Sequence, residues 1–125
     1  MPAFAIAGLV LLAILAVSQI ALAAGAPLGR FAWGGRHDVL PRNLRIGSVV
    51  AVLIYAVFAL FLVSKAGLVS IIGEPLLTIG MWVIVIYLVL NSVMNLLSRS
   101  KFERLVMTPV ALVMGAVFLV VTLTA

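Results

Sequence analysis

The residues best suited to acid–base or nucleophilic chemistry in this chain are few. Arg36, His37 and Asp38 are adjacent, and His37 is the only histidine. Three consecutive residues do not share one face of a helix or strand, so a nucleophile and base pair would need a partner from elsewhere in the chain. An enzyme that acts on a lipid headgroup through His37 and Asp38 is therefore the least favoured hypothesis. We expect no enzymatic activity and no catalytic residues.

Metal and thiol chemistry are also poorly supported by the sequence. The chain has no cysteine and a single histidine. Structural and catalytic metal sites in proteins draw mainly on several cysteine, histidine or carboxylate ligands. We therefore expect no metal site and no cofactor.

Four polar side chains inside long apolar stretches are the best candidates for a binding site: Gln19, Tyr87, Asn91 and Asn95. Asn91 and Asn95 are spaced i and i+4, and Tyr87 extends the same helical face. Two interpretations stay open. The amides can bond across helix–helix interfaces, or the four residues can line a polar pocket open to the cytoplasmic side.

The elements that carry these residues are predicted from composition. The chain is 66% hydrophobic and 9% charged, with a mean hydropathy of +1.42, whereas soluble domains have about 25% charged residues. A water-soluble fold of 125 residues could not bury so much apolar surface. The surroundings of the chain are therefore expected to be lipid.

Four apolar stretches reach the ~20 residues that a helix needs to cross a bilayer. They cover about residues 3–24, 46–64, 76–98 and 105–124. The first is expected to be a retained helix and not a cleaved signal peptide, because no Lys or Arg precedes Arg30. Asn43 is a plausible N-cap for the second, whose end is left open between Ser64 and Gly73. The predicted fold class is all-α: one integral membrane domain over 1–125, an antiparallel bundle of four transmembrane helices.

The positive charges predict the orientation of this bundle. The formal net charge is +5, and of eight Lys and Arg only Lys65 lies outside residues 25–45 and 99–104. The positive-inside rule makes these two segments cytoplasmic loops and places both termini outside. Beside membrane spans, such charges favour anionic lipid headgroups over nucleic acid as partners. The candidate headgroup or partner contacts are Arg30, Trp33, Arg36, His37, Arg42, Arg45, Arg99 and Arg104.

Three segments, "GAPLGRFAWGG", "VLPRNLRIGS" and "MNLLSRSKFERLVMTPV", resemble an uncharacterised family of small four-span bacterial, often actinobacterial, membrane proteins. The resemblance runs from the first span through Pro109 and implies the four-span layout without an activity. Met107 departs from it, because a Trp is expected there. The family's recurring positions fall on Gly34, Gly35, Arg45, Asn95, Ser98, Arg99, Ser100, Glu103, Arg104 and Pro109.

Two functions remain. Small residues recur along the first and fourth spans, for example Ala5 with Gly8 and Ala111 with Gly115, and such stripes let helices approach closely. The favoured function is a non-enzymatic membrane protein that acts through helix packing, as a subunit or scaffold for a partner membrane protein or as a homo-oligomer. The alternative is a carrier or binding protein for a small lipid or neutral solute, which would use the four polar residues.

Overall fold

The computed structural model describes residues 2–25, 39, 41–98, 101 and 103–124. Over these ranges the chain is helical, with turns between the helices and no strand. The main helices are α1 (Pro2–Ala23), α2 (Arg42–Lys65), α3 (Leu76–Leu96) and α4 (Thr108–Thr124), and a π-helical turn, η3 (Glu103–Met107), leads into α4. With η3 included in the last one, from Arg104 to Thr124, all four are long and apolar enough to cross a membrane. This confirms the expected all-α fold with four helices of membrane-spanning length.

The second helix starts earlier than its apolar stretch. Arg42 to Arg45 were expected in a loop, but they form the first turn of α2, with extended Pro41 as the cap residue. The expectation that Asn43 caps this helix is wrong, because Asn43 lies within it. Hydropathy marks where a helix enters apolar surroundings, and the backbone can continue as helix into the polar interface. In the same way, Arg104 belongs to η3 and not to a loop.

Gly67 fixes the end of α2, which the sequence left open. Its φ of 78° is a left-handed conformation that favours glycine. The amide of Gly67 donates to the Ser64 carbonyl at 3.2 Å, and that of Leu68 donates to the Val63 carbonyl at 3.0 Å. These two bonds form a Schellman motif. The helix therefore ends at Lys65, and residues 66–75 form the connection to α3.

A polar cluster ties this connection to both helices. Lys65 Nζ lies 3.2 Å from Glu74 Oε1 and donates to Thr78 Oγ1 at 2.9 Å. Thr78 donates its hydroxyl to the Glu74 carboxylate at 2.7 to 2.8 Å and its amide to Oε2 at 3.2 Å. Glu74 thus forms an ion pair with Lys65 across this connection.

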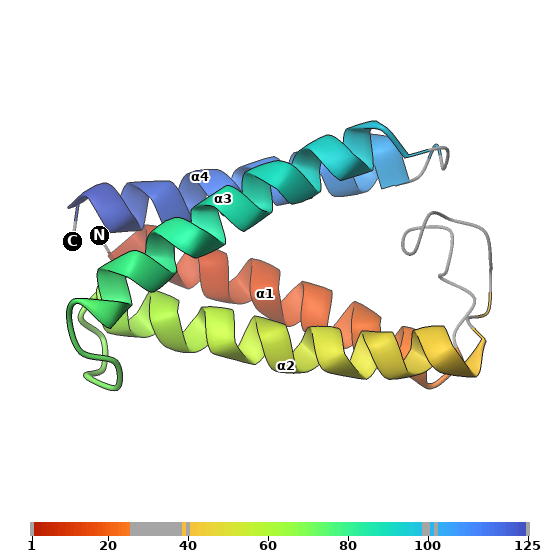
Figure 1. The fold of residues 1–125 in the computed structure, drawn as a ribbon, viewed down its shortest axis with the longest axis horizontal. Coiled ribbons are helices and arrows are strands. Elements are labelled where there is room, and N and C mark those ends of the chain that lie inside the picture. Colours follow the sequence, from red (N-terminus) through yellow and green to blue (C-terminus); the bar gives the residue numbers. More distant parts are fainter. Residues whose placement is uncertain (1, 26–38, 40, 99–100, 102, 125) are drawn as a thin grey trace.

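The helices form two antiparallel hairpins, α1 with α2 and α3 with α4. Both chain termini lie at one end of the bundle, here called the terminal end (Figure 1). The opposite end carries Arg42, Arg45, Lys101 and Arg104 and is called the basic end. In Figure 1 the two hairpins lie close together at the terminal end and diverge toward the basic end.

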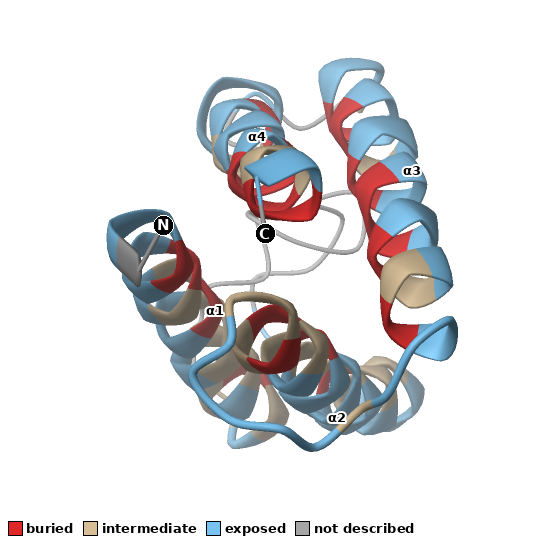
Figure 2. Ribbon diagram, turned by 90° about the vertical axis from the view of Figure 1, so that its left-hand side faces the viewer, coloured by how far each residue is buried: buried red, intermediate tan, exposed pale blue. Residues whose placement is uncertain are grey.

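The hydrophobic core occupies the half of the bundle nearest the terminal end. Residues coloured as buried lie mainly on the faces of the helices that point toward the other helices (Figure 2). The fully buried Leu62, Met81, Phe118 and Val121 all lie in this half of their helices. The members of the core cluster are Ala5, Leu12, Phe58, Leu62, Leu77, Met81, Ile84, Val85, Leu88, Met114, Phe118 and Val121.

The outward faces of the same helices are apolar. Large side chains such as Ile14, Leu53, Val83 and Leu112 are each more than half exposed. Soluble monomers rarely expose apolar surface on this scale. These faces are those expected of a multi-pass membrane protein whose helices contact lipid.

Candidate binding site

A pocket lies between the two hairpins, on the side of the core that faces the basic end. Each of the four helices contributes to it: Leu12 and Leu15 from α1, Tyr55 and Phe58 from α2, Tyr87, Leu88 and Asn91 from α3, and Val110, Ala111 and Met114 from α4, with Met107 of η3. The cavity volume is about 30 Å³, enough for one or two water molecules. Helix divergence thus leaves a narrow, mixed polar and apolar space near the middle of the bundle.

Aromatic rings close this pocket toward the terminal end. The buried ring of Phe58 packs edge-on against three others, with centroid distances of 6.5 Å to Tyr55, 5.7 Å to Tyr87 and 6.1 Å to Phe118. Such edge-to-face pairs are a favourable aromatic geometry. Phe58 also belongs to the buried core, so the pocket borders the core on this side.

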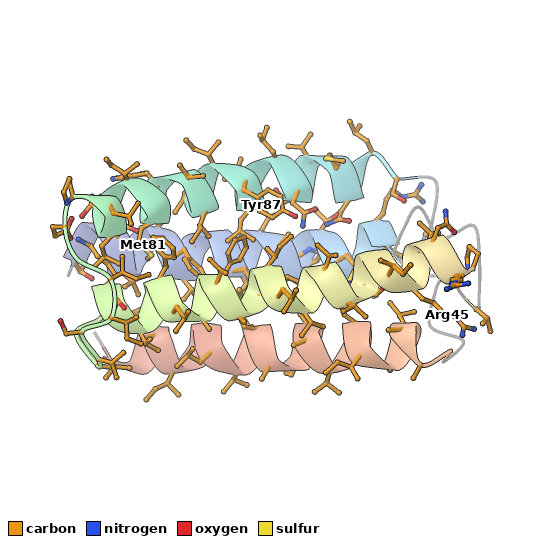
Figure 3. All side chains as sticks on the ribbon, turned by 60° about the horizontal axis from the view of Figure 1, so that its bottom comes forward. Arg45, Met81 and Tyr87 are labelled. Atoms are coloured by element: carbon orange, nitrogen blue, oxygen red, sulfur yellow. The ribbon has the colours of Figure 1, made fainter. Side chains whose placement is uncertain are left out.

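The polar groups of the pocket come from both hairpins. Tyr55 of α2 and Tyr87 of α3 both line the pocket, and both rings pack against Phe58. Gln19 of α1 lies near Tyr55. The oxygen of its side-chain amide, Gln19 Oε1, is buried, and no hydrogen-bond donor among the described residues reaches it. A buried acceptor without a donor costs about 1–3 kcal/mol. Figure 3 shows Tyr87 midway along α3, between Met81 in the core and the level of the basic end, where Arg45 lies.

Hydroxyl groups elsewhere in the helices are satisfied locally. Ser92 donates to the Val89 carbonyl at 2.6 Å, and Thr122 donates to the Phe118 carbonyl at 2.6 Å. Bonds of this kind, from a hydroxyl to the preceding helical turn, let Ser and Thr lie in apolar surroundings. The phenols of Tyr55 and Tyr87 and the amide of Asn91 instead belong to residues that line the pocket between the helices.

Asn95, the fourth predicted site residue, is not among the pocket-lining residues. It is buried, and it lies one turn closer to the basic end than Asn91. A Cβ at Gly115 of α4 would lie 3.6 Å from Leu88 Cβ of α3, so these two residues are level with each other. Because the two helices are antiparallel, Asn95, seven residues after Leu88, is level with Thr108, seven residues before Gly115. Thr108 is also buried, and its hydroxyl has no partner among the described residues. Asn95 is thus better placed for the α3–α4 interface than for the pocket.

The structure therefore contains a pocket that is lined by two of the four polar residues proposed from the sequence. Tyr87 and Asn91 line the pocket, and Gln19 lies beside it through Tyr55. Tyr55 was missed by sequence reasoning. A tyrosine in the middle of an apolar span, far from either interface, was the available signal, because its hydroxyl needs a polar neighbour at that depth.

The predicted headgroup contacts can be placed only in part. Arg42 is exposed, Arg45 is half-buried with its guanidinium near Gly25, and Arg104 is exposed and donates to the Ser98 carbonyl at 3.4 Å. All three lie at the basic end. The other predicted contacts, Arg30, Trp33, Arg36, His37 and Arg99, lie outside the described residues, as does Asp38.

Comparison with known proteins gives no match to a protein-family model, to a curated protein or to a solved structure. The resemblance to a four-span bacterial family stays a prediction. Any argument about function rests on the pocket itself.

Proposed function

We propose that this chain is a membrane-embedded binding protein that takes up a small, uncharged molecule in the pocket between its two hairpins. The observation that carries the proposal is the juxtaposition of Tyr55, Tyr87 and Asn91 around one cavity in otherwise apolar surroundings. Pockets that combine an apolar lining with a few convergent polar groups are typical ligand sites. In lipid, polar groups that face a cavity are most often functional.

The alternative function, as a scaffold or homo-oligomer, has less support than the sequence suggested. It rested on the small-residue stripes. Those stripes are buried within the chain: a Cβ added at Gly8 would lie 2.7 Å from Leu62 Cδ2 and 2.9 Å from Val117 Cγ1, and Gly115 lies against Leu88. Because Gly8 and Gly115 bring this chain's own helices together, these two positions do not serve as a contact face for a partner. Assembly with a partner protein or a second copy stays a prediction.

As part of the same proposal, the distribution of Lys and Arg sets the orientation of the protein in the membrane. The basic end would lie in the cytoplasm of a bacterial cell, with both termini outside. The pocket is closed behind Phe58 and lies on the basic side of the core, so a ligand would enter from the cytoplasmic leaflet or the cytoplasm. The arginines at this end would contact anionic headgroups around the entrance.

The test is ligand retention by a variant that removes one polar group from the pocket. The tagged protein is extracted from its native membrane in lipid nanodiscs, and co-purifying small molecules are identified by mass spectrometry. We expect the wild type to retain a compound that Asn91→Leu loses by about tenfold or more, since loss of a hydrogen-bonding group leaves the ligand's polar atom unpaired.

The matched control is Asn43→Leu, which makes the same chemical change at an exposed position on the first turn of α2. It should retain the compound at the wild-type level. Equal retention by Asn91→Leu and wild type, or no retained compound in either, would contradict a binding function. A second protein that co-purifies stoichiometrically with all three forms would instead support the scaffold alternative.

A further inference from the structure

The depth of the pocket restricts the chemistry of its ligand. Asn91 lies five residues before the end of α3, and Tyr55 thirteen residues after the start of α2. At ~1.5 Å per residue, these groups lie about 8 to 20 Å from the basic ends of their helices. A bilayer core is ~30 Å thick, so the polar groups of the pocket lie at hydrocarbon depth.

A charged group does not suit this position. Among the residues that the structure describes, the pocket lining contains no Asp, Glu, Lys, Arg or His. The described cations of the basic end lie at the ends of the helices, beyond direct contact with Tyr55 or Tyr87. Burial of an ion without a counter-ion is strongly unfavourable. A carboxylate or phosphate would therefore stay at the basic end and leave the pocket empty.

An alkyl chain alone does not suit it either. It would cover the phenol and amide groups of Tyr55, Tyr87 and Asn91 without giving them hydrogen bonds. Buried polar groups without partners are unfavourable. The occupant must offer both a donor and an acceptor at this depth.

Size decides which polar group can meet these needs. A cavity of about 30 Å³ admits a group no larger than one or two waters. A hydroxyl is the smallest group that both donates and accepts. Tyr87 is 48% exposed although it lines the pocket, so the pocket reaches the lipid-facing surface there. A hydroxyl can enter while its alkyl chain stays in the surrounding lipid.

We infer that the ligand is a neutral, hydroxyl-bearing amphiphile, held by its hydroxyl between Tyr55, Tyr87 and Asn91, with its apolar chain leaving past Tyr87. This inference rests on the proposed binding function and specifies its ligand class. Tyr55 is then the main specificity-determining residue, because it is the polar residue that α2 contributes to the pocket, whereas Tyr87 and Asn91 both come from α3.

The test uses methionine methyl groups as local reporters in nanodiscs of saturated phosphatidylcholine. Met107 and Met114 line the pocket, Met81 lies in the core, and Met94 is 69% exposed. Dodecanol, dodecyl methyl ether and dodecanoate are titrated separately, and methyl NMR shifts are followed. Shifts at Met107 and Met114 report pocket occupancy, whereas shifts at Met94 report partition into the surrounding lipid.

We expect dodecanol to shift Met107 and Met114 at a concentration about tenfold lower than the ether or the carboxylate. Tyr55→Phe, which removes only a hydroxyl, should abolish this preference. Thr124→Val is the matched control, because its hydroxyl bonds to its own helix at the terminal end, and it should keep the preference.

The other outcomes distinguish a failure of the hydroxyl inference from a failure of the proposed binding function. Equal affinity for the three probes would overturn the hydroxyl inference and leave the binding function standing, and so would tighter binding of dodecanoate. Loss of the preference in Thr124→Val as well as in Tyr55→Phe would also overturn the assignment of Tyr55. Shifts confined to Met94 would overturn both the inference and the proposed function.

Discussion

At the scale of single residues, polar groups beside the pocket and polar groups at the terminal end differ in whether described residues satisfy their hydrogen bonds. Beside the pocket, Gln19 Oε1 is buried, and no donor among the described residues reaches it. At the terminal end, Glu74 is exposed and its oxygens accept from Thr78 and Lys65. The first arrangement suits binding, and the second suits a fixed connection between helices.

The connection predicts a measurable titration. The Thr78 hydroxyl, followed by Lys65, lowers the pKa of Glu74 below its ordinary value of 4.5. Because the pKa is lowered in the folded state, the charged carboxylate stabilises the fold above the ordinary value, and this contribution is lost as the pH falls through the lower folded-state value. Carbon NMR titration of Glu74 in Thr78→Val should give a higher midpoint than in the wild type. An unchanged midpoint would mean that Thr78 does not hold the carboxylate; Thr124→Val should match the wild type.

At the scale of helices, glycine positions set how closely α1 approaches its neighbours. Gly8 faces Leu62 of α2 and Val117 of α4, so one position joins α1 to both hairpins. The ring of Phe61 similarly fills the space that a Cβ at Gly80 would need, at the contact between α2 and α3. Both glycines lie on the terminal side of the pocket, where the hairpins meet.

Gly8→Ala is therefore expected to destabilise the bundle by about 1–3 kcal/mol, the range for overpacking a well-packed interior. Leu62 is fully buried and has little room to move away. Thermal unfolding followed by circular dichroism in nanodiscs would show a lower midpoint. Gly73→Ala is the control, because a Cβ there meets nothing within 4 Å. Equal midpoints for Gly8→Ala and Gly73→Ala would argue against close packing at Gly8.

At the scale of the whole molecule, the bundle has a packed half and an open half. The core joins the hairpins near the terminal end, and the pocket lies where they diverge (Figures 1 and 2). A ligand that bridges Tyr55 of one hairpin and Asn91 of the other would draw the basic halves together. The terminal halves, already packed, would act as the fixed part.

Spin labels can measure this change, because the chain has no native cysteine. Val49 with Val93 reports the distance between α2 and α3 in the basic half, and Leu60 with Ile79 reports it in the terminal half; all four side chains are exposed. Addition of dodecanol should shorten the first distance and leave the second unchanged. Equal changes in both distances would indicate movement of whole hairpins and would contradict a fixed terminal half.

The sequence by itself determined that the chain is all-α with four helices long enough to span a membrane, because the length of an uninterrupted apolar run is a local property. It also placed Tyr87 and Asn91 on one helical face, because helical periodicity is local. Only the tertiary structure decided which faces meet. In a chain bounded by lipid, outward and inward faces are both apolar, so hydropathy does not mark the side that is buried.

For that reason Tyr55 escaped the sequence analysis, and Asn95 was assigned to the pocket although the structure buries it one turn away. The start of α2 at Arg42 was also missed, because helical backbone continues beyond the apolar run that predicts it. The pocket itself exists only because the core residues of two hairpins meet in one half of the bundle and not in the other. That arrangement depends on contacts between residues far apart in the chain, such as Gly8 with Val117 and Phe58 with Tyr87.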